Sequence, residues 1–217
     1  MTVPDTKSRE PKQARSRQSF EKTIEAALAL LQERGNDEFT LADVSSRSGV
    51  SIGSIYARFE GKDDLVRVAH GRKMDDIDAI SHHLFESLPT HPEAGLESVA
   101  REAVDRIIEV LRRYADILRP FMLRATQDST ISQRGAASHA AMAAHFADVL
   151  RKWPDGFLSQ TDIDWCFNVV YSVVARRLGL GSTVEGSGTF EWREIAEKLT
   201  GMVASYLLAG LQGPADA

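Results

Sequence analysis

Cysteine is nearly absent from this sequence, because Cys166 is the only one among 217 residues. A single cysteine excludes an internal disulfide and fits a reducing compartment. Long apolar runs are also missing, and a transmembrane helix would need one of about 20 residues. The N-terminal residues contain no apolar core of the kind found in signal peptides. These absences predict a cytoplasmic protein that does not enter a membrane.

Catalytic signatures are missing too. The sequence has no glycine-rich phosphate loop and no recognisable Ser/His/Asp pattern, so we expect neither an enzyme nor a bound cofactor. One arrangement leaves an alternative open. Asp75, Asp78 and His82 are spaced three and four residues apart, which places them on one face of a helix, where they could hold a divalent metal. A metal-dependent helical enzyme is therefore a remote alternative, and a solvated acidic face is the simpler interpretation.

The hydrophobic pattern predicts an all-α fold. Apolar residues recur at spacings of three and four through most of the chain, and no segment reads as a strand. Pro120 lies within an apolar stretch, so we expect the helix there to kink or to start anew. The predicted helices cover residues 15–34, two short segments within 40–59, 62–88, 93–114, 117–126, 131–153, 161–180 and 190–211.

Residues 40–59 have the pattern of two short helices joined by a tight turn. Thr40 followed by Asp43 predicts a capping box, and Ser51 is a suitable N-cap for the second helix. Gly49 lies where the chain must reverse, and glycine adopts a left-handed backbone at little cost. The outer face of the second helix carries small or hydrogen-bonding groups, which suits a helix that enters a DNA major groove.

The spacing of these residues is similar to that of a known family. Phe39-Thr40, Asp43-Val44 and Gly49-Val50-Ser51-x-Gly53-Ser54-x-Tyr56-x-x-Phe59-x-x-Lys62 resembles the helix-turn-helix of the TetR family of transcriptional regulators. The resemblance covers about residues 14–70 and departs at Arg58, where the family often has histidine. It implies a three-helix DNA-binding domain over residues 14–62 and a helical domain for effector binding and dimerisation over 63–213.

The resemblance and the helix pattern together predict the DNA contacts. Hydroxyls and an ammonium group should touch phosphates, two side chains should reach bases, and Gly53 should let the backbones approach closely. The phosphate contacts are Thr40, Ser51, Tyr56 and Lys62, and the base contacts are Ser54 and Arg58. Residues 1–13 read as a disordered basic arm that either lies along the DNA or is merely a solvated tail. Residues 1–73 hold 13 Lys/Arg against 11 Asp/Glu, whereas the whole chain has a net charge of −5.

The last two long helices are the expected dimer interface. The helix at 161–180 is apolar on two sides, with Trp165 and Val173 on one and Phe167 and Val174 on the other. A helix that is apolar all round must be covered on both sides. In the TetR family the corresponding helices form a four-helix dimer interface, which implies that residues 161–180 and 190–211 do so here. The alternative is one unusually thick monomeric core.

A small-molecule effector is the remaining expectation, because TetR family members have a ligand cavity in the second domain. Methionine and aromatic side chains suit a cavity for an apolar or aromatic ligand. The sequence therefore predicts a homodimeric repressor that binds a palindromic operator in double-stranded DNA and is released by a small, mostly apolar ligand. A TetR-like activator or a ligand-independent regulator is the alternative. The candidate lining residues are Met74, Ile77, Phe121, Met122, Met142, Phe146, Trp165 and Tyr171.

Overall fold

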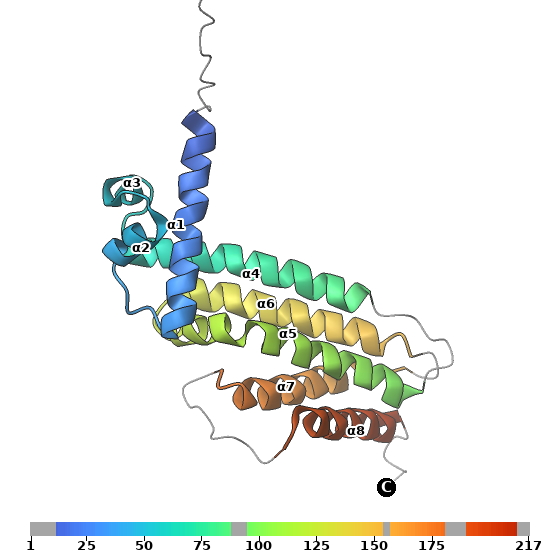
Figure 1. Ribbon diagram of the computed structural model, residues 1–217. Helices are drawn as coiled ribbons and strands as arrows, with labels where there is room; N and C mark the ends of the chain where they lie inside the picture. The colour runs from blue at the N-terminus through green and yellow to red at the C-terminus, as the bar shows by residue number, and fades with distance from the viewer. Residues whose placement is uncertain (1–11, 88–94, 154–156, 181–189, 212–217) are drawn as a thin grey trace, which may run out of the picture. The chain divides into compact units, whose positions relative to one another are not determined.

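The computed structural model describes residues 12–87, 95–153, 157–180 and 190–211 of the chain, with side chains from residue 14 onward (Figure 1). Within these ranges all regular structure is helical, which confirms the all-α prediction. The chain divides into two compact units, Met1–His70 and Gly71–Ala217. The division falls inside α4 (Lys62–Glu86), so this helix contributes residues to both units.

The first unit contains α1 (Lys12–Arg34), α2 (Leu41–Ser48), α3 (Ile52–Tyr56) and the first residues of α4. Helix α1 packs against α2, and α2 packs against α3 (Figure 1). Val44 and Ile55 carry the apolar sides of the two short helices into the core of this unit. The ring of Phe20 on α1 stacks on Phe59 with centroids 5.7 Å apart, which fixes the end of the helix-turn-helix against α1.

The second unit is built around α5 (Leu96–Ala125), which packs against α6 (Ser129–Leu150), α7 (Gln160–Arg177) and α8 (Trp192–Leu211). Its largest fully buried side chains come from several of these helices, so they share one apolar core. Members of that core include Ile107, Leu111, Phe146, Ile163, Phe167 and Leu207.

Helix α5 corrects one prediction. The expected break between residues 114 and 117 does not occur, because α5 runs continuously to Ala125 with Pro120 inside it. Proline removes one backbone donor and crowds the preceding turn, at a cost of about 3 kcal/mol in an isolated helix. Here the apolar stripe continues through the proline, with Ile117, Leu118 and Phe121 all buried. Burial of about 2 kcal/mol per large side chain offsets that cost, so tertiary packing preserves the helix.

Helices α7 and α8 each have one covered and one uncovered apolar side. On α7, Phe167 and Val174 are buried, whereas Trp165 and Val173 are 56% and 41% exposed. On α8, Val203 is buried and Tyr206 is exposed. The second apolar side of α7 expected from the sequence is therefore present and is not covered by the described residues of this chain.

Candidate nucleic-acid interface

Helix α2 begins at the predicted capping box. The Asp43 backbone N–H donates to Thr40 Oγ1 at 3.1 Å, and the Thr40 N–H donates to Asp43 Oδ2 at 2.8 Å. The bond from the Thr40 backbone holds the pKa of the Asp43 carboxyl below its ordinary value. Two of the backbone N–H groups that lack an intrahelical partner at this helix start are thereby satisfied. Thr40 is exposed, and its hydroxyl hydrogen can still be donated outward.

The turn between α2 and α3 requires Gly49. Its φ of 68° lies in the left-handed region, and its N–H donates to Ser45 O at 3.0 Å. A side chain at this φ would be strained by about 1 kcal/mol. Ser45 Oγ donates to the Val50 carbonyl at 2.7 Å, so the chain leaving the turn is tied back to α2. The turn therefore presents α3 at a fixed angle to α2.

Helix α3 is short and capped at its start. Ser51 Oγ accepts from the Ser54 N–H at 3.3 Å and lies 2.8 Å from Ser54 Oγ. Ile55 is buried, whereas Ser51, Gly53 and Ser54 are exposed and Tyr56 is 58% exposed. Two hydroxyls, a phenol and a glycine thus lie on the exposed side of a rigidly held helix.

Gly53 has no internal reason to be glycine. Its φ is outside the left-handed region, and a Cβ placed there would meet no atom within 4 Å. Glycine in a helix is about 1 kcal/mol less favourable than alanine. Neither the backbone nor the packing of this unit offsets that loss. A close approach by another molecule is the remaining physical use of a bare backbone on an exposed helix.

The two cations predicted to contact DNA are engaged within the first unit. Arg58 Nη2 donates to Ser16 Oγ on α1 at 2.9 Å. Lys62 Nζ donates to the Asp37 carbonyl at 2.8 Å and lies 3.6 Å from Asp37 Oδ2. Sequence reasoning missed Ser16, because no local pattern links it to a residue 42 positions later. Thr40, Ser51, Gly53, Ser54 and Tyr56 are exposed as expected, whereas Arg58 and Lys62 are half-buried.

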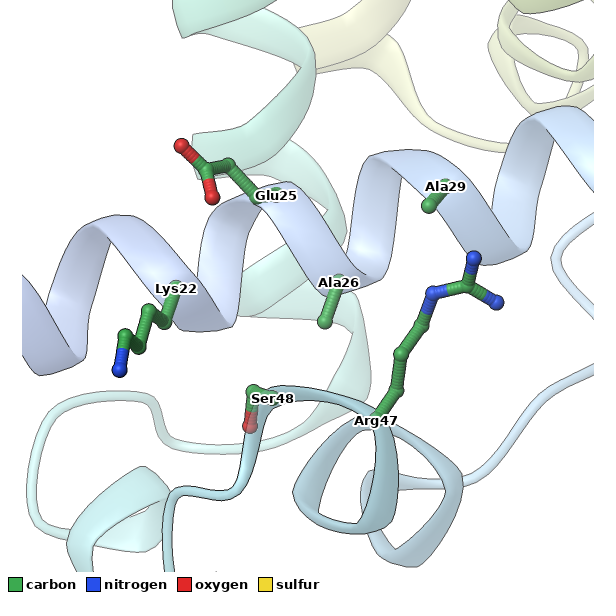
Figure 2. A pocket seen from close by; sticks show the side chains of 6 residues that line it. All are labelled: Lys22, Glu25, Ala26, Ala29, Arg47 and Ser48. Atoms are coloured by element: carbon green, nitrogen blue, oxygen red, sulfur yellow. The ribbon is translucent and has the colours of Figure 1, made fainter.

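A shallow pocket of about 370 Å³ lies between α1 and α2 (Figure 2). Ala26 and Ala29 of α1 form its apolar side, and Arg47 of α2 lies along it (Figure 2). Arg47 Nη1 donates to Glu33 Oε2 at 2.6 Å, and the paired Nη2 bonds the other carboxylate oxygen. This bidentate pair holds α2 to α1 and lowers the pKa of Glu33. Of the arm predicted at residues 1–13, residues 1–11 lie outside the described residues, whereas residues 12–13 belong to α1 and so are not disordered as expected.

The candidate ligand residues occupy different environments in the second unit. Tyr171 is half-buried and faces the His139 ring at 4.5 Å, and burial raises the pKa of its phenol. Trp165 lies on the exposed side of α7, away from the core. Met122 is half-buried. The remaining candidates are buried, namely Met74, Ile77, Phe121, Met142 and Phe146.

The acidic residues considered for a metal form an ion-pair cluster with Arg134. Arg134 Nη2 donates to Asp75 Oδ1 and to Asp78 Oδ2, both at 2.8 Å, and Ser138 Oγ donates to Asp78 Oδ2 at 3.0 Å. The guanidinium therefore occupies the space between the carboxylates that a cation would need. Across the described parts of the chain, no group of three His, Cys, Asp or Glu side chains is arranged to hold a metal ion.

No helix in the described ranges is both long enough and apolar enough to cross a membrane.

Comparison with known proteins points to one family. The family model described as "Bacterial regulatory proteins, tetR family" matches residues 24–69, which include the helix-turn-helix. An uncharacterised HTH-type transcriptional regulator of Bacillus subtilis, YvdT, is 25% identical over 109 residues. That match covers 50% of this chain and 52% of YvdT, so the chain spans about half the length of this curated relative.

Solved structures share the fold over most of the chain. A TetR-family transcriptional regulator from Streptomyces coelicolor has a TM-score of 0.60 at 18% identity, covering 88% of this chain and 83% of that one. A TetR transcriptional regulator from Rhodococcus sp. RHA1 has a TM-score of 0.53 at 18% identity, covering 91% and 99%. At this identity the likeness shows the fold alone. These findings show that residues 24–69 match the DNA-binding region of the TetR family and that the chain shares the fold of TetR-family regulators of known structure.

Proposed function

We propose that the protein is a repressor that binds a palindromic DNA operator as a homodimer and is released by a small ligand. The exposed Gly53 carries this proposal. Glycine there lowers helix stability without serving the fold, and it lies between the hydroxyls of Ser51 and Ser54. A DNA backbone or base edge that approaches α3 closely would use all three features.

Selection of bound DNA from a random pool with the full chain tests this function. A two-fold dimer presents two recognition helices, so the selected site should be a near-palindrome with half-sites about one helical turn apart, or a multiple of it. Enrichment of asymmetric or unrelated sequences would contradict the dimeric operator. A failure to enrich any sequence would contradict operator binding itself.

The uncovered apolar sides of α7 and α8 support the homodimer. Trp165 and Val173 on α7 and Tyr206, Leu208 and Leu211 on α8 are each between 38% and 56% exposed. Scattered exposed apolar residues are ordinary, but large ones gathered on two neighbouring helices favour a protein partner. A second copy would cover α7 and α8 with the same two helices and form a four-helix interface.

Helix α4 offers a route for ligand control, because its residues belong to both units. A ligand bound in the second unit would shift α4 and, through the dimer, the spacing of the two recognition helices. The ligand must bind the DNA-incompetent spacing more tightly, since equal affinity for both states changes nothing. Operator DNA must then weaken ligand binding by the same factor.

Two substitutions on α6 test this route. Met142→Trp or Ala143→Trp, which would fill a ligand cavity beside the inner face of α6, should abolish the ligand response and spare DNA affinity.

Two alternatives keep the same DNA-binding unit. In the first, the protein activates transcription, and in the second it regulates without a ligand. Transcription of the target genes in a deletion strain separates a repressor from an activator, because loss of a repressor raises expression and loss of an activator lowers it. A ligand-independent regulator would show unchanged operator affinity in the presence of every compound that raises its melting temperature.

A further inference from the structure

A pocket of about 530 Å³ lies between the second half of α4 and the end of α6, entirely within the second unit. Its inner side is apolar. Phe85 of α4 is 3% exposed and Val149 of α6 is 1% exposed, so both present only an edge or a face to the pocket. Two side chains of this kind can cover an apolar or aromatic body of modest size.

Two imidazole rings line the pocket next to its apolar inner side. The His145 ring stacks on Phe85 with centroids 5.6 Å apart and an interplanar angle of 25°. The His82 ring lies 5.1 Å from His145 at 37°. Burial, followed by the charge of His82, lowers the pKa of His145, so its ring is neutral at pH 7. The three rings therefore offer a continuous aromatic surface with hydrogen-bonding nitrogens along it.

The mouth of the pocket carries charges of both signs. Two carboxylates, Glu86 and Asp148, and one ammonium, Lys152, line it. Asp148 already accepts from Arg151 Nη1 at 3.1 Å. Glu86 has a histidine for its partner, with His82 Nε2 at 3.2 Å from Glu86 Oε1, and this contact is an ion pair only when the imidazole is protonated. Glu86 is thus the carboxylate best placed to receive a cation from outside.

We propose that this pocket binds a small amphiphilic amine, with its aromatic or apolar body on Phe85, Val149 and His145 and its ammonium group facing Glu86. A carboxylate ligand is disfavoured because its head group would be repelled by Glu86 if it took the place of the ammonium group. The assignment rests on the proposed function and deepens it, since it gives the ligand a polar head that the sequence did not suggest. It also places the ligand between α4 and α6.

The location gives the ligand a direct effect on α4. The cluster of Arg134 with Asp75 and Asp78 joins the same two helices. Asp78 and His82 are four residues apart on α4, so the ion pairs and the pocket occupy neighbouring turns of one helix. A ligand between Phe85 and Val149 pushes on α4 close to the point where Arg134 holds it. Occupation of the pocket therefore changes the packing of α4 on α6.

Three probes with one carbon skeleton test the head group. The full-length protein is titrated by calorimetry at about pH 7.5 with 3-phenylpropylamine, 3-phenylpropan-1-ol and 3-phenylpropionate. The amine should bind at least about tenfold more tightly than the alcohol, in line with one charge-assisted hydrogen bond, and the carboxylate should bind more weakly than both. Equal affinity for amine and alcohol, or tighter binding of the carboxylate, would overturn the assignment.

Two variants test the location. Glu86→Gln should remove the preference for the amine over the alcohol, whereas the control Asp76→Asn, an exposed carboxylate on α4 that does not line the pocket, should leave it intact. Val149→Phe should fill the apolar inner side of the pocket and weaken all three probes. If that variant is poorly folded, the C–H signals of His82 and His145 in histidine-labelled protein provide a second measurement. Absence of amine-induced shifts at both rings would place the binding elsewhere and refute the proposal.

Operator affinity, measured with and without the amine, separates this inference from the proposed function. Operator binding that the amine weakens supports both. Amine binding at the histidine pair without operator binding overturns the proposed function and leaves the pocket assignment standing. Operator binding without any amine site overturns the pocket assignment alone.

Discussion

Two exposed surfaces of this protein have opposite chemistry. The outer side of α3 carries Ser51, Gly53 and Ser54, which are small, polar or bare, while α7 exposes Trp165 and Val173. On the first surface the exposed Ile52 and Tyr56 lie among hydrogen-bonding groups, which remain available to a polar partner. The second has large apolar groups whose removal from water is worth about 25 cal/mol per Å². The contrast indicates that each surface is built for a different class of partner.

A charge on the apolar surface should have the largest effect. Val173→Glu should convert the proposed dimer into a monomer and lower operator affinity by about 10²-fold or more, because the two half-sites would no longer be bound together. Analytical ultracentrifugation and an operator titration measure both quantities. Gln133→Glu, at an exposed position on α6, adds the same single negative charge and is the control. A folded Val173→Glu monomer with full operator affinity would exclude the four-helix interface.

Substitution of Arg58 tests base recognition next to the polar surface of α3. Arg58→Ala should relax the preference at one base pair, losing about 1–3 kcal/mol of discrimination. Ser16→Ala should give a smaller loss at the same base pair, because Ser16 Oγ accepts from the guanidinium and orients it. Ser19→Ala is the control, since its hydroxyl bonds the Arg15 carbonyl within α1. An unchanged selected motif for Arg58→Ala would remove this residue from base recognition.

Glycine substitutions separate fold from function. Gly53→Ala should leave the first unit folded, or make it up to about 1 kcal/mol more stable, while it weakens DNA binding about tenfold. Gly71→Ala is the matched control, because Gly71 is also a helical glycine at which an added Cβ would meet no atom within 4 Å. Chemical denaturation and operator titration are the measurements. Undiminished DNA affinity in Gly53→Ala would mean that nothing approaches α3 closely at this point.

Lys62 tests whether a cation that is engaged in the free protein also contacts phosphate. Lys62→Ala should weaken binding to all sequences alike and reduce the salt slope by about one. Its bond to the Asp37 carbonyl allows a second role in positioning the loop before α2. Asp37→Asn keeps the ammonium and that carbonyl, so it should leave the salt slope unchanged. If the Lys62→Ala slope is also unchanged, Lys62 only positions the loop.

The smallest effect concerns pH. Burial lowers the pKa of His139 and His145 below their ordinary value of 6.5. Near and below that pH the unfolded chain binds more protons than the folded one, so the free energy of unfolding decreases as the pH falls through about 6.5. Thermal melts between about pH 8 and 5.5 should show this loss, and His139→Gln should reduce it. The lowered pKa of Glu33 in the first unit acts only below its ordinary value of 4.5, so Glu33 does not contribute to this loss.

Local patterns predicted much of the structure. The capping box at Thr40, the left-handed turn at Gly49 and the cap at Ser51 each depend on a few neighbouring residues, and all three are present. The helical periodicity located most of the helices for the same reason. The prediction of separate helices at 93–114 and 117–126 was wrong, because local propensity was overcome by the burial of Ile117, Leu118 and Phe121.

Residue types and their spacing alone determined an all-α chain with a helix-turn-helix, because caps, turns and amphipathic stripes act over a few residues. Tertiary structure decided which polar groups remain available. Arg58 bonds Ser16, Lys62 bonds Asp37, and Asp75 and Asp78 share Arg134, over separations of 25 to 59 residues. It also brought His82, Phe85 and His145 together into one pocket. Such pairings depend on how helices pack in space, and no local spacing in the sequence records that.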